Sequence, residues 1–95
     1  MNSGQIQIEE IIKALQQLGG EAQAKEIKDK VTQNRGGIPQ HYKTRHTFRE
    51  TIQRIIEDYC PQSANYRYKA IFQRIRRGRY KLMRNTFPFN YEPKN

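Results

Sequence analysis

The sequence predicts a small, mainly α-helical domain with one β-hairpin near its C-terminal end. Apolar residues recur at helical spacing in three segments before residue 60. After residue 70, a glycine separates two short runs rich in β-compatible residues, as in a hairpin. Since a chain of 95 residues has room for one hydrophobic core, these elements are expected to form a single domain.

The first helix is expected after a short start, residues 1–4. Its apolar residues lie three and four positions apart and form one stripe, which comprises Ile8, Ile11, Ile12, Leu15 and Leu18. Gly19 and Gly20 follow the stripe and end the helix, because glycine readily leaves helical geometry.

A brief strand is predicted at residues 21–23, and a second helix at residues 24–33. Ala24, Ile27 and Val31 have the spacing of a buried helical face. The sequence Asn-Arg-Gly-Gly at 34–37 then breaks the helix.

The third helix has the clearest pattern of the chain. Thr47 and Glu50 fit a capping box, which predicts a helix start at this threonine. The expected buried stripe comprises Phe48, Ile52, Ile55, Ile56 and Tyr59. Cys60 followed by Pro61 ends the helix, because a residue before proline is disfavoured in helical geometry.

A polar loop at residues 61–68 leads into the hairpin. Its strands are predicted at residues 70–75 and 79–83, and Gly78 supplies the positive φ of a tight turn. Tyr80 and Leu82 alternate with charged residues, so one face is expected to pack and the other to stay in water. Residues 1–85 are therefore interpreted as one domain and residues 86–95 as a tail or linker end.

Positive charge is concentrated in the second half of the chain. The net charge is +9, of which residues 1–34 contribute −1 and residues 35–85 contribute +10. Such asymmetry is typical of proteins that bind a polyanion, most often nucleic acid. The single cysteine and the absence of long apolar runs predict a cytoplasmic protein with no membrane segment.

The expected order is helix, strand, helix, helix and two strands, which is the order of a winged helix-turn-helix. The segment IPQHYKTRHTFRETIQRIIEDYCPQSANY, followed by IFQRIRRGRYKL, resembles winged-helix domains attached to bacterial restriction-type endonucleases, including HNH enzymes. The resemblance covers roughly residues 6–84 and extends more distantly to HARE-type helix-turn-helix domains. It implies a non-catalytic domain of a restriction or defence system that binds double-stranded DNA, with a nuclease domain or subunit as a partner.

Candidate DNA contacts lie at the start of the third helix, in the following loop and in the hairpin. The recognition helix would lie in the major groove and the arginine-rich wing on the backbone. Arg49 has the chemistry to read guanine, and Gln53 that to read adenine. The full set is Lys43, Thr44, Arg45, His46, Arg49, Gln53, Arg67, Lys69, Arg74, Arg76, Arg77, Arg79 and Lys81.

Two other functions stay open. Some relatives of the group read methylated adenine or cytosine; without tryptophan, such a base pocket would need Tyr42, Tyr66 or Tyr68. A winged helix can also act as a protein–protein adaptor.

No pattern of catalytic, cofactor-binding or metal-binding residues is present, since His41 and His46 lack the spacing and companions of a metal site. The sequence leaves the DNA target and the oligomeric state undetermined.

Overall fold

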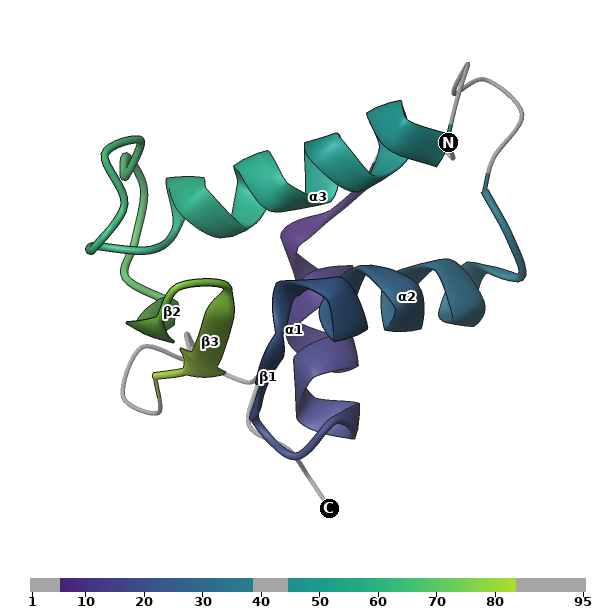
Figure 1. Ribbon diagram of the computed structural model, residues 1–95, viewed down its shortest axis with the longest axis horizontal. Coiled ribbons are helices and arrows are strands. Elements are labelled where there is room, and N and C mark those ends of the chain that lie inside the picture. Colours follow the sequence, from purple (N-terminus) through teal and green to yellow (C-terminus); the bar gives the residue numbers. More distant parts are fainter. Residues whose placement is uncertain (1–5, 39–44, 84–95) are drawn as a thin grey trace.

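The computed structural model describes residues 6–38 and 45–83, which fold as three helices and a three-stranded antiparallel sheet (Figure 1). The order is α1 (Ile8–Gln17), β1 (Glu21–Gln23), α2 (Ala24–Arg35), α3 (Arg45–Asp58), β2 (Phe72–Arg76) and β3 (Arg79–Leu82). The predicted order of elements is therefore confirmed, including the brief first strand. In the described residues, no helix is long and apolar enough to cross a membrane.

Most helix ends follow local sequence signals. Gly19 and Gly20 end α1 with φ of 94° and 92°, and Gly36 caps α2 with φ of 83°. At the other ends, the carboxylates of Glu10 and Glu26 accept hydrogen bonds from backbone N–H groups that precede α1 and α2. These bonds satisfy donors that the first helical turn leaves open.

The predicted start of α3 is wrong. The helix begins at Arg45, so Thr47 lies inside its first turn and is not the N-terminal cap. Glu50 does not close a capping box with Thr47; its carboxylate lies 3.6 Å from the His46 ring, one turn earlier. Phe48 is completely buried, and its packing holds this first turn in place without the predicted cap.

The sheet has the order β1-β3-β2, with β3 in the centre. In the register, Tyr80 lies between Ala22 of β1 and Arg74 of β2. Gly78 has φ of 74° and forms the predicted tight turn, and its carbonyl accepts the N–H of Ala24 at 2.8 Å. The hairpin turn is thus attached to the start of α2.

The core contains the predicted apolar stripes of all three helices. Tyr80 from the hairpin is buried within it. Four residues of the predicted stripes pack against the core but are only half-buried: Ile8, Leu18, Ile55 and Tyr59. In the described residues no polar or charged residue is buried. The largest fully buried side chains of the described residues are Phe48, Phe72, Ile11, Ile12, Leu15, Ile27, Ile52, Ile56, Val31 and Cys60.

The arrangement of the helices fixes the position of the hairpin. In Figure 1, α2 and α3 run in opposite directions, α1 passes behind the start of α2, and the hairpin lies beside the C-terminal end of α3 and the start of α2. The carbonyl of Tyr59 accepts the N–H groups of Ile71 and Phe72, which ties β2 to the end of α3. The start of α3 lies about 20 Å away, at a rise of about 1.5 Å per residue.

Candidate nucleic-acid interface

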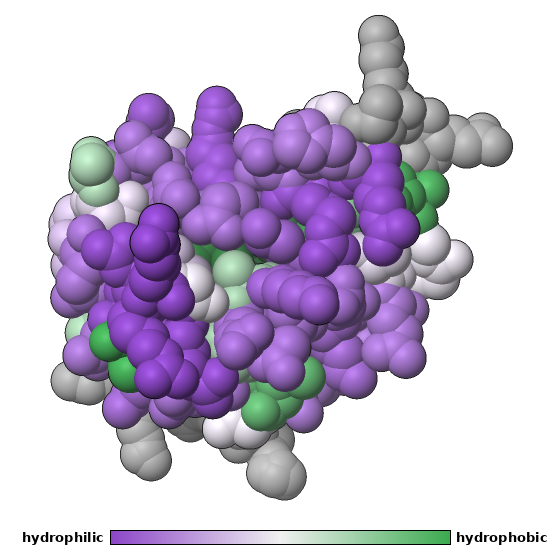
Figure 2. Space-filling model, viewed as in Figure 1, coloured by the Kyte–Doolittle hydropathy of each residue, from purple (hydrophilic) through white to green (hydrophobic). Residues whose placement is uncertain are grey.

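The predicted DNA contacts fall into two groups at opposite ends of α3. Arg45, His46 and Arg49 lie in its first turns, whereas the hairpin cations lie beside its last turn. Lys43, Thr44 and Tyr42 lie outside the described residues. The face shown in Figure 2, formed by α2, α3 and the hairpin, is covered mostly by hydrophilic side chains.

The outer face of the sheet carries one acidic group among several cations. The Nε of Arg79 donates to Glu21 at 2.7 Å. This hydrogen bond is the largest cause of a lowered pKa of Glu21; desolvation opposes it, and the charges of Arg79, Lys81 and Arg76 add to the lowering. Glu21 therefore neutralises one guanidinium while the neighbouring cations keep their charge.

Four hairpin cations have no acidic group within 4 Å among the described residues, and all four are exposed: Arg74, Arg76, Arg77 and Lys81. Four like charges on so short a hairpin repel one another in water. This surface is therefore suited to an anionic partner.

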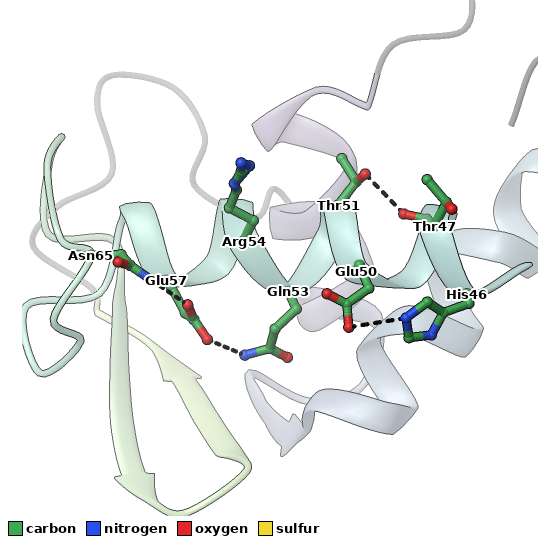
Figure 3. Close-up of a pocket in the computed structure, with 8 residues that line it drawn as sticks. All are labelled: His46, Thr47, Glu50, Thr51, Gln53, Arg54, Glu57 and Asn65. Atoms are coloured by element: carbon green, nitrogen blue, oxygen red, sulfur yellow. Dashed lines mark hydrogen bonds and ion pairs between the residues drawn. The ribbon is translucent and has the colours of Figure 1, made fainter. Parts of the chain in front are cut away.

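The exposed face of α3 is less basic than its sequence predicts. The Glu57 carboxylate accepts hydrogen bonds from the amides of Gln53 at 2.9 Å and Asn65 at 2.8 Å (Figure 3). Gln53 also lies 3.4 Å from the Tyr80 hydroxyl. An open pocket follows this face and includes Glu50, so carboxylates lie between the two groups of predicted contacts.

The two predicted base readers both have partners inside the protein. Arg49 donates to Asp29 of α2 at 2.7 Å, and its side chain is only 23% exposed. Gln53 is held by Glu57. Burial, and then the charge of Arg49, lowers the pKa of the neighbouring Lys28, although Glu50 and Glu57 act in the opposite direction. These contacts occupy part of the hydrogen-bonding capacity of Arg49 and Gln53 and hold both side chains against the protein.

Arg54 is an exposed cation that the sequence-based set omits. It lies midway along α3, and Figure 3 shows its side chain on the opposite flank of the helix from Gln53. Helical periodicity was sufficient to find it, because position 54 is one turn after the exposed Glu50. In contrast, no local pattern links Asn65 in the loop to Glu57 on the helix.

The half-buried Tyr59 and the exposed Tyr68 form a tilted aromatic pair. The Tyr68 ring lies 5.0 Å from the Tyr59 ring at 36°, and the Arg67 guanidinium is 5.8 Å from the Tyr68 centroid. Burial raises the pKa of Tyr59, with smaller contributions from Tyr68, Asp58 and Glu9. Tyr66 is 41% exposed. Tyr66 lines an open hollow with Arg54 and Arg67, whereas Tyr68 packs on Tyr59.

Other reactive groups are few in the described part of the chain. Cys60 is fully buried, and its thiol lies 3.5 Å from the Gln62 side-chain oxygen. No three His, Cys, Asp or Glu side chains of these residues are grouped to hold a metal ion.

Comparison of the chain with protein-family models, curated proteins and solved structures finds no match. The function must therefore be inferred from the residues themselves.

Proposed function

We propose that this chain is a winged-helix module that binds double-stranded DNA and carries no catalytic site. The observation that supports this best is the set of exposed hairpin cations without acidic partners among the described residues: Arg74, Arg76, Arg77 and Lys81. Phosphate groups of a duplex would neutralise these charges and release condensed counterions, which favours binding.

The topology is compatible with a winged helix. A helix, a short strand and two helices precede a hairpin, whose second strand pairs with the short strand. In this proposal α3 is the recognition helix and the hairpin β2–β3 is the wing.

The distribution of charge along α3 agrees with a helix that lies in a groove. Cations occur at both ends, with Arg45 in the first turn and the hairpin beside the last. A helix about 20 Å long can reach both phosphate rims of a major groove about 12 Å wide. The exposed Glu50 would then face base edges between the rims, where a carboxylate accepts a hydrogen bond from the amino group of cytosine.

The test is duplex binding measured by fluorescence anisotropy at increasing salt, with random-sequence, methylated and single-stranded DNA. Six contacts, from the four hairpin cations with Arg45 and Arg54, predict a logarithmic salt slope of about −5. Affinity should then fall about a thousandfold between 50 and 200 mM salt. A preference for methylated over unmethylated duplex would indicate a modified-base reader instead.

A matched pair of variants separates DNA binding from an adaptor role. Arg76→Ala with Arg77→Ala should weaken binding about thirtyfold near physiological salt and reduce the slope by about 2. The control, Lys13→Ala with Lys30→Ala, removes the same charge from α1 and α2 and should change the slope little. Salt-independent affinity, or equal effects of the two pairs, would contradict the proposal.

A further inference from the structure

An exposed aromatic and cationic surface lies in the loop between α3 and β2. Tyr68 is 54% exposed and Tyr66 is 41% exposed, and together with Ile75 they are the exposed large hydrophobic side chains of the described residues. Arg67 and Lys69 alternate with them in sequence and are also exposed. We refer to Tyr66, Arg67, Tyr68 and Lys69 as the loop platform.

The backbone of the loop platform is fixed against the end of α3. The N–H groups of Arg67 and Tyr68 both donate to the carbonyl of Asp58, at 2.9 and 3.0 Å. The Tyr68 ring rests on the half-buried Tyr59 ring, 5.0 Å between centroids. An aromatic ring that is already held in place loses little conformational freedom when a ligand stacks on it.

Positive charge surrounds these rings. Arg54 of α3 lines an open hollow with Tyr66 and Arg67, and Arg74 of β2 is attached through its N–H to Gln62 of the same loop. The acidic group in the hollow is Asp58, whose carboxylate lies 3.8 Å from Arg67. The cations therefore outnumber the acid around the platform.

Aromatic faces combined with cations suit a ligand that has both flat rings and phosphates. Bases inside a duplex are stacked on each other and offer no free face, whereas unpaired bases do. Charge complementarity excludes a cationic peptide as the partner. We propose that the loop platform binds a single-stranded segment continuous with the duplex, with unpaired bases stacked on Tyr68 and Tyr66 and a phosphate bound by Lys69.

This inference rests on the proposed duplex binding, and the experiment separates the two. Anisotropy is measured for a blunt duplex and for the same duplex with a short oligothymidine extension at its 3′ or 5′ end. At fixed salt, one extension should tighten binding about tenfold, the usual order for stacking of a base on an aromatic side chain. Tyr68→Ala should remove this gain and leave the blunt duplex affinity unchanged. Tyr68→Phe should keep it, because the stacking face remains.

Urea unfolding of each variant identifies any that fails to fold, and Tyr66→Ala then provides a second test that does not disturb the Tyr59 contact. Equal affinity for blunt and extended duplexes, both dependent on salt, would overturn the inference and leave duplex binding in place. A gain that survives both Tyr68→Ala and Tyr66→Ala would also overturn it. Loss of salt-dependent binding to every probe would instead overturn the proposed function.

Discussion

Replacement of Arg35 by methionine should destabilise the fold more than any other single charge removal in the described residues. Arg35 at the end of α2 binds Glu10 of α1 through two contacts, Nε to Oε1 at 2.7 Å and Nη2 to Oε2 at 2.8 Å. Its guanidinium also lies 5.7 Å from the centroid of Phe48 in α3. One side chain therefore connects all three helices.

The expected cost follows from the burial of the pair. Exposed ion pairs contribute about 0.2–1 kcal/mol, whereas removal of one partner from a fully buried pair costs about 3–5 kcal/mol. The side chains of Arg35 and Glu10 are 16% and 30% exposed. Arg35→Met should therefore lower the free energy of unfolding by about 2 kcal/mol, or Tm by about 8–16 °C.

The measurement is urea unfolding followed by far-UV circular dichroism. Methionine keeps an unbranched apolar chain beside Phe48, so the loss reports mainly on the charge and its hydrogen bonds. Arg35→Lys should retain part of the stability, because lysine keeps the charge but cannot bind a carboxylate with two parallel hydrogen bonds. The control Arg54→Met removes an exposed arginine and should stay within about 0.5 kcal/mol of the parent. A similar small change for Arg35→Met would refute the reasoning.

Four further predictions concern the hairpin and the strand β1 that pairs with it. Gly78→Ala should lower the free energy of unfolding by about 1 kcal/mol, because φ at this position is 74°. The added methyl group itself meets no atom within 4 Å. An unchanged midpoint of urea unfolding would show that the turn tolerates L-residues. The pKa of Glu21 is lowered in the folded state, so its contribution to stability is present above the unfolded pKa and is lost as pH falls through the folded pKa. Tm measured from about pH 6 to about pH 3 should therefore fall less steeply for Glu21→Gln than for the parent, and parallel curves would argue against the ion pair. Glu21→Gln should also strengthen duplex binding, because it releases Arg79 from its ion pair. Arg76→Ala should reduce the slope of log affinity against log salt by about 1. Weaker binding of Glu21→Gln, or a steeper slope for Arg76→Ala, in anisotropy titrations would contradict these roles of the charges.

The sequence by itself determined the order of the elements and the position of the turn. Helical spacing of apolar residues and the conformational freedom of Gly78 are local properties, and they specify local structure directly. The start of α3 was missed because the Thr47–Glu50 pattern is also local but weaker than tertiary packing. Phe48 is completely buried, and the turn around it is stabilised by the core.

Only the tertiary structure decided which cations are available to a partner. Arg35, Arg49 and Arg79 are bound to acids 25, 20 and 58 residues away in the chain. In contrast, the exposed hairpin cations Arg74, Arg76, Arg77 and Lys81 have no acidic partner among the described residues. Opposite charges attract according to their distance in space, and the folding of the chain sets that distance independently of separation in sequence. The number of charges can therefore be counted in the sequence, whereas the fold determines which cations are neutralised by an acid.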